Sequence, residues 1–205
     1  MKGNLPAEKG DAIVCRNKRP DRQRPAPPEE RSIVSPICPI TVQPARREDL
    51  QVLPGWFSTE AELIQWGGPQ LSFPLDAPQL AAMWAEYSDT PPRRLIWSGH
   101  GAGTGIVAHA QAVLNWPERT ARLARIGLAP ALRGQGLAQD FLAAVIAQLA
   151  ELEDFTRLEL NVYSFNQPAI RLYERLGFTT EDIAPATAAA AKHGWEVMRM
   201  ARPLP

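Results

Sequence analysis

Apolar and polar residues recur with two different periods along residues 40–205, and the period identifies the element at each place. Recurrence every three or four residues predicts helices, because such positions share one helix face, and strict alternation predicts strands. The helical segments are residues 46–52, 59–66, 76–86, 137–149 and 168–176. The alternating segments are residues 40–42, 94–97, 106–113, 122–128, 158–162 and 195–200. The pattern therefore predicts a domain that contains both helices and strands.

Cap and turn residues support the bounds of the second helix. Ser58 is placed to cap the helix over residues 59–66, where acidic residues in the first turn suit the helix dipole. Gly67, Gly68 and Pro69 follow and end it, because they disfavour helical continuation.

The order of the elements predicts the fold class. The strands over residues 94–128 follow one another directly, and the glycine-rich residues 99–105 suit a hairpin between two of them. After residue 137 helices and strands alternate. This order predicts an α+β fold with three layers, in which helices on both sides flank one mixed, mostly antiparallel central sheet.

Residues 1–39 differ from the rest of the chain in composition. They hold seven of the 20 prolines, and eight Lys and Arg against five Asp and Glu. Residues 19–31 have no apolar period, and their prolines interrupt both helices and central strands. We therefore expect residues 1–39 to be a disordered Pro/Arg-rich extension and residues 40–205 to be the folded domain. A basic arm that binds a polyanion is the functional alternative for the extension.

The composition of the whole chain excludes several classes of protein. The 22 basic and 22 acidic residues balance, so no overall field favours nucleic acid or an anionic membrane. We find no apolar run near the roughly 18 residues of a membrane span and no signal peptide. Cys15 and Cys38 are too few for a disulfide scaffold or a four-cysteine zinc site. We therefore expect a soluble, cytoplasmic protein.

The segment that says most about function joins the strand over residues 122–128 to the helix over residues 137–149. Gly134 and Gly136 let backbone amides approach a ligand without interference from a Cβ atom. The helix N-terminus adds free N–H groups and a partial positive charge, and Arg133 adds a charged, directional donor. The segment therefore predicts a phosphate-binding turn. An ordinary glycine-containing turn is the alternative.

Two other phosphate motifs fit this turn poorly. A Walker loop ends in Gly-Lys-Ser/Thr, but the chain has no lysine between Lys18 and Lys192. A dinucleotide-binding fingerprint that starts at Gly134 requires Gly or Ala at position 139, where the chain has Gln139.

Two motifs together resemble the GCN5-related N-acetyltransferase (GNAT) superfamily. Arg133, Gly136 and Ala138 match the three defining positions of Arg/Gln-x-x-Gly-x-Gly/Ala. Residues 158–178 resemble the second block of the superfamily, which has a strand, an asparagine and a helix that ends Leu-Tyr-Glu-x-x-Gly-Phe. The resemblance extends over about residues 94–202 and is looser over residues 40–93. It implies a GNAT-like fold and an N-acetyltransferase that uses acetyl-CoA as co-substrate, without a metal.

The resemblance also implies positions for acetyl-CoA. In the superfamily the strand before the turn is bulged and its backbone binds the pantetheine arm. The turn amides hold the pyrophosphate, and an asparagine at the start of the later helix contacts the cofactor. The matching residues are Ile126, Gly127, Leu128, Arg133, Gly134, Gln135, Gly136, Leu137, Ala138 and Asn166. Asn166 has a second, compatible role as N-cap of its helix, with Pro168 just inside.

Tyr173 matches the tyrosine that often serves as general acid in the superfamily. The chemistry suits this residue type, because the departing CoA thiolate needs a proton from a donor of comparable pKa. Packing on the helix face with Ala169 and Leu176 is the structural alternative for Tyr173.

The general base is not identified. Ribosomal-protein N-terminal acetyltransferases, which the C-terminal half resembles, have a glutamate twelve residues before the tyrosine. This chain has Asn161 there, which cannot accept a proton. Glu159 lies on the same strand face and could act through water, or it is a solvated charge at the strand end. The departure also disfavours a protein N-terminus as the substrate.

Other candidates carry weaker implications. His100, His109 and His193 are scattered, so we expect no metal site. We expect a core role for the tryptophans Trp56, Trp66 and Trp84, with an acceptor pocket as the alternative. Residues 180–192 are expected to form a solvated loop, whose Glu181 and Asp182 would suit a cationic amine at a substrate rim.

Three functions follow from the resemblance. The first is acetyl transfer to a primary amine of a small molecule, by direct attack in a ternary complex. The second is acetyl transfer to a protein or peptide. The third is a non-catalytic acyl-CoA-binding module, which the missing base keeps open. We expect no nucleic-acid or membrane partner, and a homodimer is left open.

Overall fold

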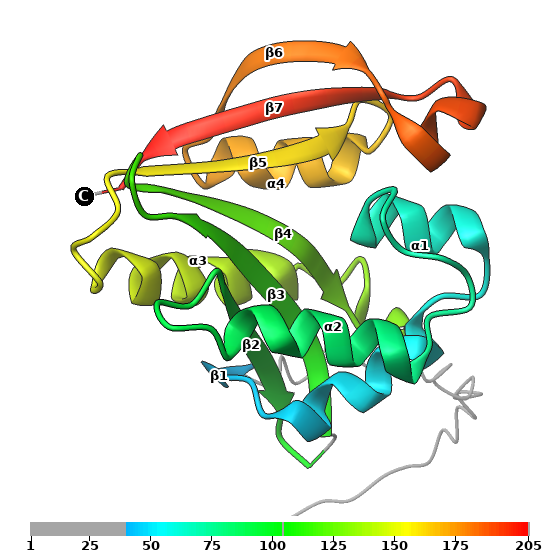
Figure 1. The fold of residues 1–205 in the computed structure, drawn as a ribbon, viewed down its shortest axis with the longest axis horizontal. Helices are drawn as coiled ribbons and strands as arrows, with labels where there is room; N and C mark the ends of the chain where they lie inside the picture. Colours follow the sequence, from blue (N-terminus) through cyan, green and yellow to red (C-terminus); the bar gives the residue numbers. More distant parts are fainter. Residues whose placement is uncertain (1–39, 104, 205) are drawn as a thin grey trace, which may run out of the picture. The chain divides into compact units, whose positions relative to one another are not determined.

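The computed structural model describes residues 40–103 and 105–204 of the 205-residue chain. In this part of the chain, seven strands form one sheet in the order β1-β2-β3-β4-β5-β7-β6 (Figure 1). The strands are β1 (Thr41–Pro44), β2 (Arg94–Gly101), β3 (Gly105–Asn115), β4 (Thr120–Leu128), β5 (Arg157–Tyr163), β6 (Thr179–Pro185) and β7 (Glu196–Pro203). The parallel pair is β4 and β5, and the other neighbours are antiparallel. The predicted mixed, mostly antiparallel sheet is confirmed.

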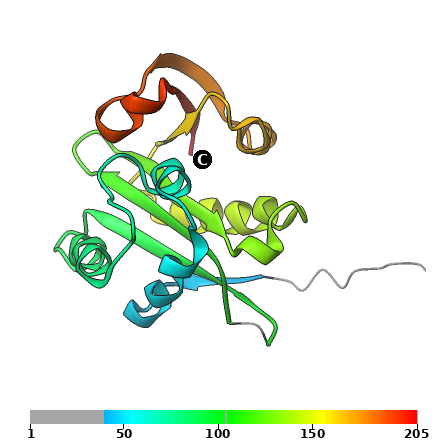
Figure 2. The same ribbon diagram turned by 90° about the vertical axis from the view of Figure 1, so that its right-hand side faces the viewer.

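Helices cover both faces of this sheet. The α-helices are α1 (Glu60–Gly67), α2 (Ala77–Tyr87), α3 (Leu137–Ala150) and α4 (Gln167–Arg175), and the short 3₁₀ helices are η1 (Arg47–Trp56), η2 (Pro130–Leu132) and η3 (Ala188–His193). Figure 2 shows α3 and α4 on one side of the sheet and η1, α1 and α2 on the other. The expected three-layer α+β arrangement is therefore present.

The larger core lies between the sheet and the helices α3 and α4. It forms because the apolar residues of α3 recur at helical spacing while those of β3, β4 and β5 alternate. Its main side chains are Phe141, Leu142, Val145 and Leu149 from α3, Ile170 and Tyr173 from α4, and Leu123, Leu158, Leu160 and Met200 from the sheet.

A second core lies under η1, α1 and α2. Its buried side chains include Leu50, Leu53, Trp56, Leu63, Leu80, Met83 and Ile96. Trp66 and Trp84 pack against it but keep part of their surface exposed. The expectation that the three tryptophans belong to the core therefore holds fully for Trp56, whereas Trp66 also lines a cavity.

The cap of α1 differs from the expectation. Thr59, not Ser58, is the N-cap, and its hydroxyl accepts a hydrogen bond from the Glu62 amide at 3.2 Å. Ser58 instead donates from its own amide and hydroxyl to the Glu62 carboxylate, at 2.7 and 3.0 Å. Two hydroxyl residues stand side by side here, so the sequence did not distinguish them.

The expected loop over residues 180–192 is wrong. Thr179–Pro185 is strand β6 and Ala188–His193 is the 3₁₀ helix η3. Every residue of β6 is exposed, because β6 is an edge strand that pairs with β7 on one side only. An exposed edge strand needs no apolar alternation, so the hydrophobic pattern gave no indication of it.

The expectations for residues 1–39 lie outside the described residues, as do Cys15 and Cys38. Within residues 40–103 and 105–204, no helix has both the length and the apolar character that crossing a membrane requires.

Candidate active site

Strand β4 carries a bulge near the middle of the sheet. Its Ala124 lies opposite Gln111 of β3 and its Gly127 opposite His109, so β4 holds two residues where β3 holds one. The distortion includes Arg125, whose φ of 50° lies in the left-handed region that non-glycine residues seldom adopt. The bulge that the resemblance implied is therefore present.

Strands β4 and β5 separate beyond their first few residues. They pair from Thr120 and Arg157 to Leu123 and Leu160, and the described residues show no pairing between them past that point. Figure 1 shows the two strands diverging toward their C-terminal ends. The sheet therefore has an opening between the last residues of β4 and β5.

The turn between β4 and α3 presents a row of backbone amides. Gly134 and Gly136 have φ of 76° and 81°, and a Cβ at either position would meet no atom within 4 Å. The described residues provide no backbone acceptor for the N–H groups of residues 134–138, and Gly136 offers no side-chain cap to α3. Consecutive free N–H groups at a helix N-terminus fit a phosphate or pyrophosphate.

The side chain of Arg133 fixes the start of this turn. Its Nε donates to the Leu128 carbonyl at 3.2 Å and its Nη2 to the Trp56 carbonyl at 3.0 Å. The guanidinium thus ties the end of β4 to the end of η1. Its predicted contact with a phosphate stays a prediction, and it would have to come from the remaining donors.

The β4 residues expected beside the pantetheine arm are partly buried. Ile126 and Leu128 pack against the larger core. Gly127 lies under the indole of Trp66, and a Cβ at this position would come within 3.0 Å of Trp66 Nε1. Trp66 Nε1 is buried and has no hydrogen-bond partner among the described residues. Glycine at position 127 therefore has a packing reason that the sequence did not reveal.

Asn166 is the N-cap of α4. Its Oδ1 accepts a hydrogen bond from the Ala169 amide at 3.4 Å, and Pro168 stands in the first turn. The structural role weighed for Asn166 is therefore confirmed. A contact with acetyl-CoA stays a prediction, and the side-chain amide nitrogen is the atom available for it.

Tyr173 is buried in α4, with 8% of its surface exposed, and its ring meets that of Phe178 edge-on at 6.0 Å between centroids. Burial raises the pKa of the Tyr173 hydroxyl to about 12. The hydroxyl therefore keeps its proton at neutral pH. Its packing role is observed, and its catalytic role stays a prediction.

A cavity of about 420 Å³ lies beside the opening, next to the C-terminal end of α1. Its lining from the two diverging strands is Arg122, Leu123, Ala124, Arg125, Asn161, Val162 and Tyr163. None of residues 133–138 lines it, and neither does Asn166. The cavity and the amide-rich turn are therefore separate sites.

The position expected for a general base remains without one. Asn161 is exposed and lines the cavity. Glu159 lies 3.9 Å from Arg157 and is not part of the lining. The carboxylate of Glu181 also pairs with Arg157, at 2.5 Å, and this ion pair lowers the pKa of Glu181. No observation favours Glu159 or Glu181 as the base.

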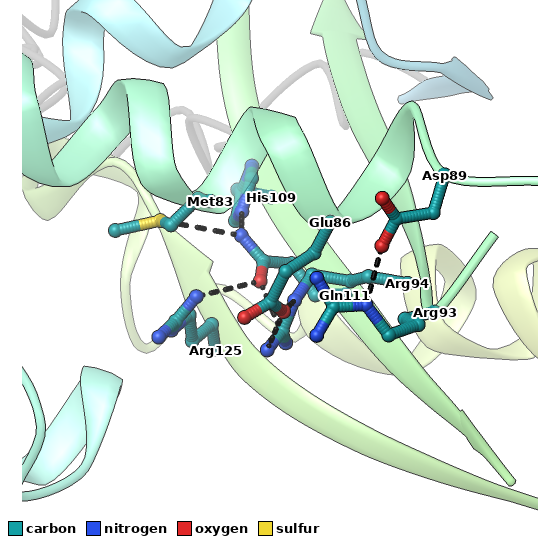
Figure 3. Close-up of polar contacts among 8 residues, drawn as sticks. All are labelled: Met83, Glu86, Asp89, Arg93, Arg94, His109, Gln111 and Arg125. Carbon is teal, nitrogen blue, oxygen red and sulfur yellow. Dashed lines mark hydrogen bonds and ion pairs between the residues drawn. The ribbon is translucent and has the colours of Figure 1, made fainter.

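Two residues that line the cavity, Arg94 and Arg125, belong to a largely buried polar network. Figure 3 shows its polar contacts. The Gln111 side-chain oxygen accepts from Arg94 Nη1 and from Arg125 Nη1, each at 3.1 Å. The carboxylate of Glu86 pairs with Arg94 at 2.6 Å. Two guanidinium groups thus share one amide oxygen, and the network holds a single carboxylate.

The arginines fix the orientation of Gln111 and, through it, the tautomer of His109. Because the amide oxygen faces two obligate donors, the amide nitrogen faces His109 Nε2 at 2.9 Å, which must then accept. The proton of His109 therefore lies on Nδ1, which is buried without a partner among the described residues. Burial, and then the charges of Arg125 and Arg94, lower the pKa of His109 to about 3. A neutral histidine follows.

The structure brings the predicted residues together in part. Residues 126–128 lie at the end of β4, and residues 133–138 form the turn into α3 and its first residues. Tyr173 lies in α4, the helix that follows β5, and Asn166 is the N-cap of that helix. Sequence reasoning missed Arg94, Gln111 and Arg125, because only the β2–β3 and β3–β4 registers show that they meet. Within the described residues no group of three potential metal-binding side chains occurs.

Comparison with known proteins relates the chain to acetyltransferases. Residues 60–178 match the family model described as Acetyltransferase (GNAT) family. A mycothiol acetyltransferase from Corynebacterium aurimucosum is 30% identical over 131 residues, which are 60% of this chain and 42% of that protein. A spermine/spermidine N(1)-acetyltransferase from Bacillus subtilis is 46% identical over 46 residues, 22% of this chain and 30% of that protein. The chain thus spans less than half the length of the curated relatives it matches.

Solved structures show the same fold. A spermidine N-acetyltransferase from Vibrio cholerae, in complex with CoA and spermine, superposes with a TM-score of 0.66 at 18% identity, over 80% of this chain and 95% of that one. The ribosomal-protein-S18-alanine N-acetyltransferase from Escherichia coli gives a TM-score of 0.58 at 23% identity, over 80% and 94% of the two chains. With a family model that matches more than half of its length, and with this fold, the chain belongs to the acetyltransferase (GNAT) family.

Proposed function

We propose that this chain is an N-acetyltransferase that transfers the acetyl group of acetyl-CoA to a primary amine of a small molecule. The observation that carries the proposal is the row of free amides at residues 134–138, at the end of a bulged strand and beside an opening in the sheet. Such a row suits the pyrophosphate of a CoA ester, and the family supplies the chemistry.

The residues proposed to hold acetyl-CoA lie along the end of β4 and the start of α3. The backbone of residues 126–128 would bind the pantetheine arm. The free amides of residues 134–138 would bind the pyrophosphate, since the Arg133 amide already donates to the Pro130 carbonyl. Asn166 would add its side-chain amide nitrogen while its oxygen caps α4. The Arg133 side chain would hold the turn in place through its contacts with Leu128 and Trp56.

Acetyl-CoA supplies an activated acyl group: the amine nitrogen bonds to the carbonyl carbon, the C–S bond breaks with its electron pair on sulfur, and nitrogen loses one proton while sulfur gains one. We assign the donation to sulfur to the Tyr173 hydroxyl, which burial keeps protonated. Tyr173 would then recover a proton from solvent. Because the amine attacks directly, initial rates at varied concentrations of both substrates should give intersecting rather than parallel double-reciprocal lines.

The acceptor would bind in the cavity that borders the opening from the side of α1. Its volume of about 420 Å³ falls within the usual range for small-molecule sites, roughly 300–1,000 Å³. The names of the spermine and spermidine relatives describe small amines as their substrates. Asn161 in place of a glutamate weakens the case for a protein N-terminus.

Release of free thiol from acetyl-CoA, measured across a panel of small amines and short peptides, tests the proposal. Turnover with at least one small amine is expected. Turnover with peptides alone would favour the protein-modifying alternative. Acetyl-CoA binding in calorimetry without turnover of any acceptor would favour a non-catalytic binding module.

A further inference from the structure

We propose that the acceptor carries a carboxylate, which the guanidinium groups of Arg125 and Arg94 bind in the cavity. The inference rests on the proposed function and names its substrate class. Three arginines, Arg94, Arg122 and Arg125, line the cavity, and no Asp or Glu among the described residues does. The acceptor site is thus built for an anionic group.

Among the three arginines of the cavity, Arg125 is the one whose positive charge is least neutralised by nearby carboxylates. It donates to the Gln111 oxygen at 3.1 Å, and the described residues place no carboxylate within 4.0 Å of it. Glu86 pairs with Arg94, so the charge of Arg125 is left over. Arg122 differs, because it neighbours Glu159 in the sheet register. The uncompensated charge therefore belongs to Arg125.

The network also holds this guanidinium in place before a ligand binds. Gln111 is fully buried and fixed by contacts with Arg94, His109 and Met83 (Figure 3). Arg125 itself sits at the bulge, where its backbone conformation is set by the β3–β4 pairing. A planar guanidinium held in one orientation binds a carboxylate through two parallel hydrogen bonds.

The same charges disfavour a polyamine. Spermidine and spermine are polycations, and each further ammonium group would face arginines instead of carboxylates. The substrate named for several relatives is therefore a poor guide to this chain, even though the fold is shared.

The test compares acceptors that differ in the carboxylate. Wild-type full-length protein is assayed with acetyl-CoA and L-lysine against cadaverine, L-leucine against L-leucinamide, and spermidine. We expect a kcat/KM at least about tenfold higher for the carboxylate member of each pair. Arg125→Gln should lower kcat/KM for the carboxylate members by about 10–100-fold, which is the usual contribution of a charged hydrogen bond. The kcat/KM for cadaverine, which has no carboxylate, should stay within about twofold of the wild-type value. Arg125→Lys should restore part of the loss.

Arg47→Gln is the matched control, because Arg47 is exposed and lies outside the cavity. This variant should leave kcat/KM unchanged for both members of each pair. A preference for spermidine or cadaverine, or an equal loss with both members in Arg125→Gln, would overturn the inference while the proposed function stands. A carboxylate on the acyl donor is the other source of the same chemistry. If succinyl-CoA with cadaverine exceeds acetyl-CoA with L-lysine, and Arg125→Gln removes that advantage, the carboxylate belongs to the donor and the inference fails.

Binding without turnover separates the two proposals. Calorimetry with N-acetyl-L-leucine and N-acetyl-L-leucinamide reports on the anion site even if no acceptor is acetylated. Tighter binding of the carboxylate, lost in Arg125→Gln, supports the anion site whatever the fate of the proposed reaction. Equal binding of the two overturns it.

Discussion

Tyr173 combines deep burial with a proposed task that requires its hydroxyl proton. Tyr173→Phe keeps the ring contact with Phe178 and removes only the hydroxyl, which makes no hydrogen bond among the described residues. The rate should fall by roughly 10²–10⁴, the usual share of a positioned acid, while acetyl-CoA affinity and melting temperature stay nearly constant. Because the loss is confined to the transition state, kcat and kcat/KM for the amine should fall together. Wild-type turnover in the variant would assign the donation to water or another group.

Two substitutions at Gly136 separate the effect of a negative charge from the effect of a side chain at this position. Gly136→Asp would place a negative charge on a turn proposed to bind pyrophosphate, so acetyl-CoA affinity should drop more than tenfold, about 1.4 kcal/mol. Gly136→Asn is the matched control, because Asn tolerates the φ of 81° as well as Asp does and carries no charge. Calorimetry should show a much smaller loss for Asn than for Asp. Equal affinities for both variants would place the phosphates elsewhere.

At single residues, the sequence allowed prediction where a local rule applied. The glycines at 134 and 136 indicated the turn because a left-handed backbone is a local property. The meeting of Arg94 with Arg125 across Gln111 could not be predicted, because it depends on strand register and on a bulge. The orientation of the Arg133 side chain could not be predicted either, because it depends on the Trp56 carbonyl, which is distant in the sequence.

Helix α4 shows how one residue can serve both an element and a ligand. Asn166→Ala removes the cap and should lower the free energy of unfolding by about 1 kcal/mol, within a range of roughly 0.5–2. Asn166→Ser keeps a capping oxygen and should lose only a few tenths of that figure. If the amide nitrogen contacts acetyl-CoA, both variants should bind it more weakly. Retained affinity in both would leave Asn166 with its capping role alone.

Among the elements, those with a buried face were predicted and those without one were not. α3 and β5 each bury one face against the larger core, and that burial imposes a readable period. β6 buries none of its residues, and its place at the sheet edge is set by pairing with β7. The opening between β4 and β5 could not be predicted either, because the divergence of two strands does not alter their hydrophobic pattern.

For the molecule as a whole, His109 links stability to pH. The folded state keeps His109 neutral down to about pH 3, whereas the unfolded chain takes up a proton near 6.5. The unfolded state therefore binds more protons between these values, and stability falls as the pH is lowered through this window. Wild type should lose about 2 kcal/mol more than His109→Gln between pH 6.5 and about pH 4.5. Urea unfolding at the two pH values measures the difference.

His193→Gln, which changes an exposed histidine, is the control for that experiment and should follow wild type. If His109→Gln also follows wild type, His109 does not govern the acid limit of the fold. The glutamine at 109 can still accept from the Gln111 amide nitrogen, so the network with Arg94 and Arg125 need not change.

Strands β4 and β5 pair in parallel at four positions, and this pairing joins the β1–β4 part of the sheet to the β5–β7 part. Segments of a protein that share few hydrogen bonds can open locally at less cost than global unfolding. Amide deuterium exchange should therefore be faster at residues 124–128 and 161–163 than at residues 120–123. A CoA ester that lies in the opening would slow exchange on both strands at once, although they are far apart in the sequence. Slowing on one strand alone would mean that the ligand does not bridge them.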